Sequence, residues 1–563
     1  MLSYDEATAF LGEWGPYQWR IFFFLSVTII PNGYAALSMV FLADIPQYHC
    51  RLPNSSNVTT GEASFMNLNL LLPMEEVDGE QVYSKCTRYR IQIEDSLNGT
   101  THGIEPCMDG WVYSTDRYIS TIVTEWDLVC DNNWKGPFTT SVFFLGVLCG
   151  SIISGQLSDR YGRKVVLFGG IALQTILNLI QLASQSWEMF CILYFFIGVG
   201  DIANYIAAFV LGTELLGKSE RIAYTALGVC IFYAFGYMLL PLCAYYIRDW
   251  RMLLLALTLP EILYVPLWWY IPESPRWLLT QGHMEQAEAI LKDAARKNGI
   301  THHGAIFDTT SLQDSVNSNK HTHNYLDLII TSNIRNVTVL SFFMWMIATI
   351  GYYGLSLNTS SMHGDPYINC FVSAASELIV YVIVWMLMRT SPRRIATASM
   401  LLLSGGVLLL IQIVPSTLQI VITLLVMIGK SGATAVYTII YIFSSELYPT
   451  VVRNMGLGAC SMASRIGSII SPYFTYLVAY NKIWAFMLMG SLMVTAGFLS
   501  LLLPETHDQP LPETIQQMQP MNCCCTSIKQ HPCTLSSFQT TVHENNHPQD
   551  RVTSSPTSTA GLQ

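Results

Sequence analysis

The chain contains about twelve apolar runs, each close to the roughly 20 residues that an α-helix needs to cross a bilayer. The runs lie near residues 21–43, 138–158, 165–185, 188–212, 222–246, 251–271, 336–356, 368–388, 395–414, 417–443, 455–480 and 484–504. Only 12% of the residues are charged, about half the fraction of a soluble chain. We therefore predict an all-α membrane protein with two six-helix halves.

The runs divide the chain into regions. The expected regions are a cytoplasmic N-terminus (1–20), a first half (21–271) containing a large extracellular loop (44–137), a cytoplasmic linker (272–335), a second half (336–504) and a disordered cytoplasmic tail (505–563). The first run is too long for the apolar core of a signal peptide, so it is expected to be a retained helix. Charged and apolar residues alternate in the linker, which indicates amphipathic helices on the cytoplasmic surface or a plain solvated tether. The tail is rich in Pro, Ser and Thr and lacks the apolar last residue that a PDZ groove binds.

A cationic loop separates the second and third runs. It reads G-x-x-x-D-R-x-G-R-K, and its marked positions are Gly155, Asp159, Arg160, Gly162 and Arg163. Short loops rich in Lys and Arg stay in the cytoplasm. Gly155 is expected to end the second helix, and Asp159 with Arg163 is expected to form a gating contact. A shorter cationic stretch at 389–394 holds the equivalent place in the second half, which indicates a duplication.

The loop after the first run has the composition of an extracellular segment. It carries four cysteines, Cys50, Cys86, Cys107 and Cys130, and the glycosylation sequons of Asn54, Asn57 and Asn98. An even number of cysteines beside sequons indicates disulfides in an oxidising compartment, with three possible pairings.

Ionisable side chains inside membrane helices are costly, so each is a functional candidate. Arg465 lies in the middle of the eleventh run and shares a helical face with Ser461 and Ser468. Its planar fork matches a carboxylate. We expect it either to hold an anionic substrate group or to form a structural ion pair.

Aromatic residues recur at helical spacing in the neighbouring runs. Such stripes are found in ordinary packing, but several beside an intramembrane arginine indicate a box that holds a cation by its ring faces. A site of this kind fits a zwitterion with a carboxylate and a quaternary ammonium. The candidate residues besides Arg465 are Lys430, Tyr437 and Tyr441 in the tenth run, Trp345 and Tyr352 in the seventh, and Tyr233 and Tyr237 in the fifth.

A coupling ion would need oxygen ligands. Asn32 follows Pro31 where the first helix is expected to break, and Asn204 lies one turn after Asp201 in the fourth run. Neutral oxygens and a carboxylate suit sodium. The alternatives are that the asparagines only bond helices together, or that Asp201 carries a proton. We expect no metal other than sodium, no cofactor and no nucleic acid partner.

One motif suggests a different class of protein. The segment from Gly212 through Gly217, Lys218 and Ser219 satisfies G-x-x-x-x-G-K-S, which would make the chain a nucleotide-binding membrane receptor. A working phosphate loop follows a strand, whereas this one follows a membrane span, so we discount it. No nucleophile–base pair or metal set indicates an enzyme.

Five further motifs resemble a known family. They are Phe10-Leu-Gly-Glu-Trp-Gly-Pro16, Ser120-Thr-Ile-Val-Thr-Glu-Trp126, Leu227-Gly-Val-Cys-Ile-Phe-Tyr-Ala-Phe-Gly236, Pro272-Glu-Ser-Pro-Arg-Trp277 and Glu446-Leu-Tyr-Pro-Thr-Val-Val-Arg453. Over about residues 4–515 the chain is similar to the organic cation/carnitine transporters of solute carrier family 22, in the major facilitator superfamily. The resemblance implies a twelve-helix fold and plasma-membrane uptake of betaine zwitterions, usually with sodium. The alternative within this class is a facilitative carrier of organic cations.

The resemblance also implies site residues. Arg465 would hold the substrate carboxylate, Tyr205 and Tyr441 would surround the ammonium, and Asn32, Asn204 and Glu446 would be linked to sodium. Two positions depart from the family, because Asp201 and Glu261 stand where uncharged residues are expected. Phe443 two positions after Tyr441 resembles the ergothioneine-preferring branch and places ergothioneine slightly ahead of carnitine.

Overall fold

The apolar runs form long helices. The structure is a computed structural model. It describes residues 8–12, 14–51, 72–77, 80–89, 103–300, 327–415, 417–449, 451–507, 509, 512 and 515–518. The predicted glycosylation sites Asn54, Asn57 and Asn98 lie outside the described residues, as do residues 519–563 of the tail.

The first half begins with a broken span. Its pieces are α2 (Pro16–Val27), α3 (Ile30–Ala35) and α4 (Met39–Leu42). The predicted break at Pro31 is confirmed, since Pro31 occupies the first turn of α3, where a missing N–H is tolerated. The span starts at Pro16 rather than at 21, because proline also suits the first position of a helix.

The rest of this half follows the predicted order. Its elements are η1 (Ala9–Leu11), α7 (Lys135–Tyr161), α8 (Arg163–Gln181), α9 (Trp187–Leu215), α10 (Lys218–Ala223), the π-helical η4 (Tyr224–Gly228), α11 (Val229–Tyr246), α12 (Trp250–Thr258), η5 (Leu259–Tyr264) and α13 (Leu267–Tyr270). Span six is therefore interrupted at Pro260, so that η5 carries Glu261 into the protein interior.

The second half repeats the arrangement. Its elements are α17 (Asp327–Ile330), α18 (Ser332–Leu357), η6 (Asn358–Ser361), α19 (Pro366–Thr390), α20 (Arg393–Leu410), η7 (Ile411–Ile413), α21 (Gln419–Leu447), α22 (Arg453–Tyr480), α23 (Lys482–Ser500) and η8 (Ile515–Gln517). Eleven helices in the described part of the chain are long and apolar enough to cross a membrane. With the more polar 28-residue α22, which carries Arg465, they make the twelve that were predicted.

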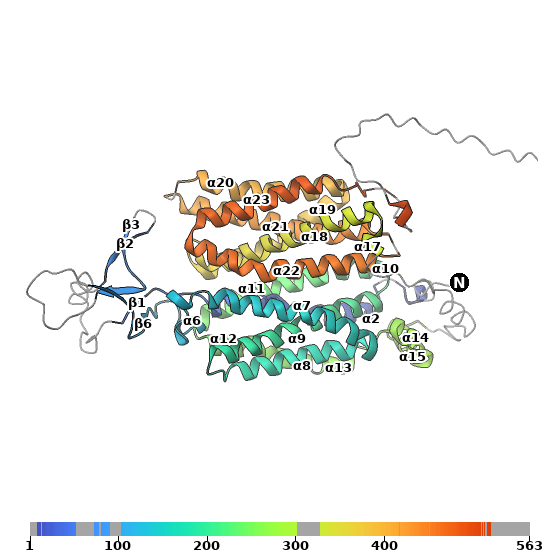
Figure 1. The fold of residues 1–563 in the computed structure, drawn as a ribbon. Helices are drawn as coiled ribbons and strands as arrows, with labels where there is room; N and C mark the ends of the chain where they lie inside the picture. Colours follow the sequence, from blue (N-terminus) through green and yellow to red (C-terminus); the bar gives the residue numbers. More distant parts are fainter. Residues whose placement is uncertain are drawn as a thin grey trace, which may run out of the picture. The chain divides into compact units, whose positions relative to one another are not determined.

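The large loop forms small antiparallel sheets on one side of the bundle (Figure 1). The pairs are β1 (Tyr48–Cys50) with β6 (Trp111–Tyr113), β2 (Met74–Val77) with β3 (Glu80–Tyr83), and β4 (Thr87–Tyr89) with β5 (Ile104–Pro106); two short helices, α6 (Ile122–Glu125) and η3 (Cys130–Asn132), follow. Of the three pairings left open, Cys50 bonds Cys107 and Cys86 bonds Cys130.

The linker forms α14 (Pro275–Thr280) and α15 (Met284–Lys297) at the opposite end of the bundle (Figure 1). The predicted amphipathic helix is confirmed, since α15 buries Ala287, Leu291 and Ala294. After it, Asn298 accepts a hydrogen bond from the backbone N–H of Tyr17 at 3.0 Å and so caps the start of span one.

The predicted tail boundary at residue 505 is wrong. Glu505 accepts backbone hydrogen bonds from Arg393 at 2.7 Å and Arg394 at 3.2 Å. Further along, Met518 is buried in a cluster with Leu328 and Ile334. Glu505 thus caps the cationic start of α20, and Met518 packs against the second half.

The halves meet through α7 with α22 and α11 with α19. The hydroxyl of Ser141 donates to the carbonyl of Ile469 at 2.7 Å, and the rings of Phe41 and Tyr367 stack at 5.3 Å. These residues belong to the parts of their helices that adjoin the extracellular loops. The halves are thus joined on the side of the large loop, which is predicted to be extracellular.

Candidate functional site

Arg465 lies in α22 beside tyrosines of both halves. Its side chain is buried, and its electrostatic neighbours are the phenols of Tyr205, Tyr353, Tyr437 and Tyr441. No ion pair with Arg465 occurs in the described part of the chain, and its Nε has no hydrogen-bond partner. Asp201 of the first half acts on Arg465 electrostatically, but no ion pair or hydrogen bond joins the two in the described residues. A buried guanidinium that contacts no acid can bind an anion.

The predicted aromatic residues come together next to it. Tyr352 stacks on Tyr437 with ring centres 5.5 Å apart, and Trp345 meets Tyr441 edge-on at 4.3 Å. Tyr441 remains 40% exposed within the described structure, so part of this cluster faces open space. The aromatic side chains of α18 share one helical face, and so do those of α21, because positions three or four apart lie on the same side of a helix.

Tyr353 was missed from the sequence. It lies close to Arg465 and packs on Phe144 of the first half at 4.7 Å. Tyr352 lies seven positions after Trp345 and therefore on the same helical face. Tyr353 is rotated by about 100° from Tyr352, so it shared no helical spacing with the predicted aromatic residues.

Lys430 was predicted to bind substrate, but an acidic side chain already pairs with it. Its ammonium forms an ion pair with Glu377 of α19 at 2.7 Å and donates to the carbonyl of Ser373 at 2.8 Å. It also lies 5.2 Å above the ring of Tyr237. Both charged side chains are almost completely buried, so the pair has already satisfied the lysine. Glu377 was overlooked, although an acid inside an apolar run was a usable signal.

Phe443 lies in the core behind the aromatic cluster. It is completely buried with Trp345, Leu447 and Tyr448, whereas Tyr441 is 40% exposed. Residues two apart on a helix point in different directions, which places Phe443 away from Tyr441. The ranking of ergothioneine over carnitine, which depended on Phe443, therefore loses its basis.

Polar groups of the first half gather where span one breaks. Asn32 donates to the carboxylate of Asp201 at 2.9 Å, and Asn204 donates to the amide oxygen of Asn32 at 3.1 Å. Asn204 also donates to the carbonyl of Thr28 at 2.9 Å. The amide oxygen of Asn204 is buried without a donor, so an unpaired oxygen lies beside the predicted ligands. These groups fit a hard monovalent cation.

Glu446 was expected at this cation site, and the structure places it elsewhere. Its carboxylate pairs with Arg393 at 3.4 Å and accepts a hydrogen bond from Thr506 at 2.6 Å. These residues lie at the ends of α21 and α20 opposite the large loop, the ends predicted to be cytoplasmic. The family motif that contains Glu446 therefore marks a contact at these ends.

The cationic loop of the first half makes the equivalent contacts. Arg163 pairs with Glu214 at 3.2 Å, and Glu273 accepts the backbone N–H of Arg163 at 3.0 Å. The guanidinium of Arg163 donates to the carbonyl five residues earlier, as that of Arg393 does in the second half. Glu446 and Glu505 thus repeat Glu214 and Glu273, which confirms the duplication inferred from the loops.

The predicted gating pair is present, with a correction to the helix end. Asp159 meets Arg163 at 3.0 Å, but the Asp159 side chain is 77% exposed and contributes little. Arg160 lies over the ring of Tyr161. Gly155 is inside α7, and the helix ends at Gly162, whose φ of 103° favours glycine.

The phosphate-loop reading is wrong. Gly212 is part of α9, where an added side chain would collide with the ring of Tyr224, and Gly217 directly precedes α10 with Lys218 and Ser219 in its first turn. A phosphate loop follows a strand and wraps an anion with consecutive free N–H groups, whereas the first four positions of this motif lie in α9 and use their N–H groups within the helix.

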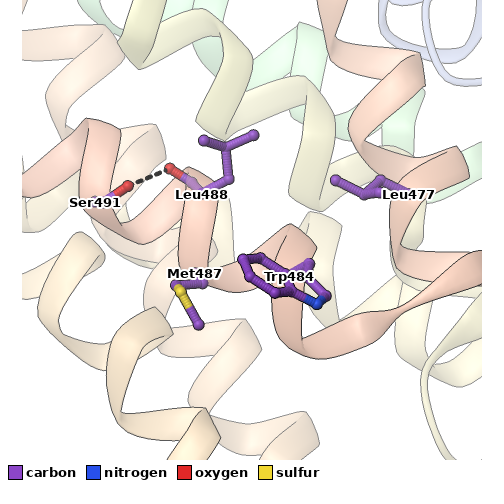
Figure 2. Close-up of a pocket in the computed structure, with 5 residues that line it drawn as sticks. All are labelled: Leu477, Trp484, Met487, Leu488 and Ser491. Atoms are coloured by element: carbon purple, nitrogen blue, oxygen red, sulfur yellow. Dashed lines mark hydrogen bonds between the residues drawn. The ribbon is translucent and has the colours of Figure 1, made fainter.

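A shallow groove of about 360 Å³ lies between α22 and α23 (Figure 2). It is lined by Leu477, Trp484, Met487, Leu488 and Ser491. Trp484 is 61% exposed and no lining residue is charged, so the groove belongs to the outer surface of membrane helices rather than to the polar centre.

Together, the duplicated six-helix halves and the polar centre between them define a membrane transporter of the major facilitator class. The profile of the family "Sugar (and other) transporter" matches residues 128–518. The inward-open structure of the xylose transporter XylE from E. coli covers 88% of this chain and 98% of its own, with a TM-score of 0.57 at 15% identity. At this identity the likeness shows the fold alone.

Sequence relatives identify the family within that class. The chain is 52% identical over 531 residues to organic cation/carnitine transporter 2 of Homo sapiens, covering 92% of this chain and 94% of that protein. It is 51% identical over 532 residues to solute carrier family 22 member 4 of Mus musculus, covering 92% and 95%. The chain belongs to solute carrier family 22 and is a multi-pass plasma-membrane transporter of small organic solutes.

Proposed function

We propose that this transporter takes up trimethylammonium betaines such as carnitine and ergothioneine, with sodium as the coupling ion. The observation that carries the proposal is the buried, unpaired Arg465 beside a cluster of aromatic rings. A betaine carries a carboxylate for the guanidinium and a quaternary ammonium for the ring faces. The name of the human relative, an organic cation/carnitine transporter, supports the same substrate class.

Charge balance supports a zwitterion over a plain cation. Glu377 would be the natural anion for an organic cation, but Lys430 already neutralises it at 2.7 Å. Arg465 then leaves a net positive charge near the aromatic cluster, which disfavours a solute with only an ammonium. A facilitative organic cation carrier is therefore the weaker reading.

Sodium would be held by the first half. Asn32, Asn204 and Asp201 offer amide and carboxylate oxygens, and the Asn204 amide oxygen lacks a donor. Sodium there would offset the Asp201 charge, while Arg465 faces the same interior from the other half. Rocking of the halves about this centre would then deliver both solutes to the cytoplasm.

The test is uptake of labelled carnitine and ergothioneine, measured side by side in expressing cells. Sodium is replaced by N-methylglucamine, and external pH is varied at zero and high sodium. We expect sodium-dependent uptake of betaines. Sodium-independent, acid-stimulated uptake lost in Asp201→Asn would replace sodium by protons at this site.

Asn204→Ala sharpens the ion assignment. It removes the orphaned oxygen, so the sodium concentration for half-maximal uptake should rise at least about threefold, while saturating sodium restores much of the rate. By linkage, sodium must tighten betaine binding by the factor by which betaine tightens sodium binding. Glu285→Gln, on the exposed face of α15, is the matched surface control.

A further inference from the structure

Glu261 occupies a second polar pocket of the first half, separate from the Asn32–Asn204 contacts. Its side chain is 1% exposed. One carboxylate oxygen lies 2.8 Å from the phenol of Tyr34 and 3.3 Å from the amide nitrogen of Gln174. The other lies 2.7 Å from the hydroxyl of Thr175. These groups come from three spans, one of them the broken span one.

No base balances this carboxylate. The titratable groups that act on it are Tyr34 from α3, Tyr264 from its own element η5, and Asp201 from α9. From α8 it meets only the neutral Gln174 and Thr175. In the described part of the chain no Lys, Arg or His forms an ion pair with Glu261. A buried charge without a partner is costly, so the pocket favours a neutral state or a bound cation.

The hydroxyl hydrogens of the pocket are too few for its contacts. The Tyr34 oxygen lies within hydrogen-bond distance of two acceptors, Glu261 and the carbonyl of Leu257 at 2.9 Å, yet a phenol has one hydrogen. The Thr175 oxygen likewise lies near Glu261 and the carbonyl of Ile171 at 2.8 Å, again with one hydrogen. The buried amide oxygen of Gln174 has no donor at all.

One added proton removes the Tyr34 half of this shortage. A protonated Glu261 donates its O–H to the phenol oxygen of Tyr34, whose own hydrogen then serves the Leu257 carbonyl. The carboxylate takes the proton from a hydronium ion: its O–H bond forms as one O–H bond of hydronium breaks, which leaves a water molecule. An ionised Glu261 leaves one Tyr34 contact and one Thr175 contact without a hydrogen, whereas a protonated Glu261 leaves only the Thr175 contact without one.

We propose that Glu261 is a proton-binding group of the transport cycle, which exchanges a proton with solution as the two halves move. The pocket joins α3, α8 and η5, so helix motion that opens it to water changes the environment of the carboxyl group. The proton site rests on the proposed function only through the choice of carnitine as labelled solute.

The main test compares pH profiles. Initial carnitine uptake is measured from about pH 5.5 to 8.5, at zero and saturating sodium, with surface expression quantified. We expect the rate of the wild type and of the control Glu285→Gln to change at least about threefold over this range, and that of Glu261→Gln less than about 1.5-fold. An unchanged wild-type profile in Glu261→Gln at normal surface level overturns the proposal.

Thr175→Val is the second variant, in case Glu261→Gln does not reach the membrane. It keeps the side-chain shape and removes one donor to the ionised carboxylate. The midpoint of the pH profile should therefore move to higher pH by about one unit. A midpoint that stays in place contradicts proton binding at Glu261.

A third measurement separates this proposal from the substrate and sodium assignments. Thermal unfolding of the purified protein is followed over the same pH range without sodium or solute. The melting difference between wild type and Glu261→Gln should vary with pH, whether or not carnitine is transported. A constant difference overturns the proton site, whereas failure of carnitine uptake alone overturns only the substrate assignment.

Discussion

The interiors of the two halves carry opposite charges. In the first half the acidic and basic side chains buried within the described spans are Asp201 and Glu261, both acids. In the second half they are Glu377, Lys430 and Arg465. Lys430 and Glu377 neutralise each other, which leaves one positive charge on Arg465.

The cytoplasmic ends show no such difference. Arg163 with Glu214 in the first half and Arg393 with Glu446 in the second make the same ion pair, at 3.2 and 3.4 Å. The duplicated halves have thus kept one set of contacts at the membrane surface while their interiors diverged. The unmatched acids suit cations and the unmatched arginine suits an anion, so binding chemistry follows the divergent part of the molecule.

The largest expected effect concerns the neutral pair of the second half. Glu377→Gln leaves the Lys430 ammonium buried without a counter-charge and should cost about 3–5 kcal/mol of stability. The apolar double variant Glu377→Leu with Lys430→Met should recover most of it and keep its betaine affinity. Thermal unfolding in detergent and uptake measure the two outcomes.

A double variant as unstable as Glu377→Gln would show that the pair is not the cause. A stable double variant with tenfold weaker betaine uptake would return Lys430 to the substrate site. Either result would contradict the conclusion that the second half contains one neutral ion pair and one unpaired arginine.

Arg465→Lys tests that unpaired charge. Lysine keeps the charge but loses the planar fork, and one charge-assisted hydrogen bond is worth roughly 1.5–3 kcal/mol. The apparent affinity for carnitine should fall at least about tenfold, whereas competition by tetraethylammonium, which has no carboxylate, should change far less. Equal losses for both solutes would make Arg465 structural.

The sequence predicted the architecture well because length and hydropathy determine which segments can cross a bilayer. The helical spacing of Tyr437 and Tyr441, and the cost of burying Arg465, also placed these residues together. Partner choice could not be predicted in this way. Lys430 carries the same charge as Arg465, and only the fold shows that Glu377, 53 residues earlier, neutralises it.

Glu446 illustrates a different limit. Its motif indicated function, but a motif does not say at which depth of the membrane a side chain lies. The comparison that could have corrected it was internal, since Glu214 stands at the same end of the matching span in the other half. The three cysteine pairings were equally open, because the loop spacing allowed each of them.

The matched cytoplasmic ends predict matched phenotypes. Glu214→Gln and Glu446→Gln each remove one partly buried ion pair worth about 1 kcal/mol, so each should lower maximal uptake by roughly fivefold or less. Neither should move the half-saturating sodium concentration by more than about 1.5-fold. A rise in that concentration in Glu446→Gln alone would restore Glu446 to the ion site and break the equivalence of the two ends.

The smallest expected effect is a change in melting temperature at the end of the bundle with the large loop, where the first half has one more acidic residue. Asp44 follows α4, accepts a hydrogen bond from Tyr118 at 2.7 Å, and has its pKa raised above the ordinary value by burial. The unfolded chain therefore ionises Asp44 at lower pH than the folded protein does. Between those two pKa values the folded protein binds the extra proton. The stability contributed by Asp44 is therefore complete at low pH and is lost as pH rises through this window.

Asp44→Asn keeps an acceptor for Tyr118 but cannot ionise. Its melting temperature relative to the wild type should accordingly increase with pH, by about 1 °C overall, in thermal unfolding of the purified protein. A difference that shrinks as pH rises would mean that ionised Asp44 stabilises this contact and that Arg117 balances its charge.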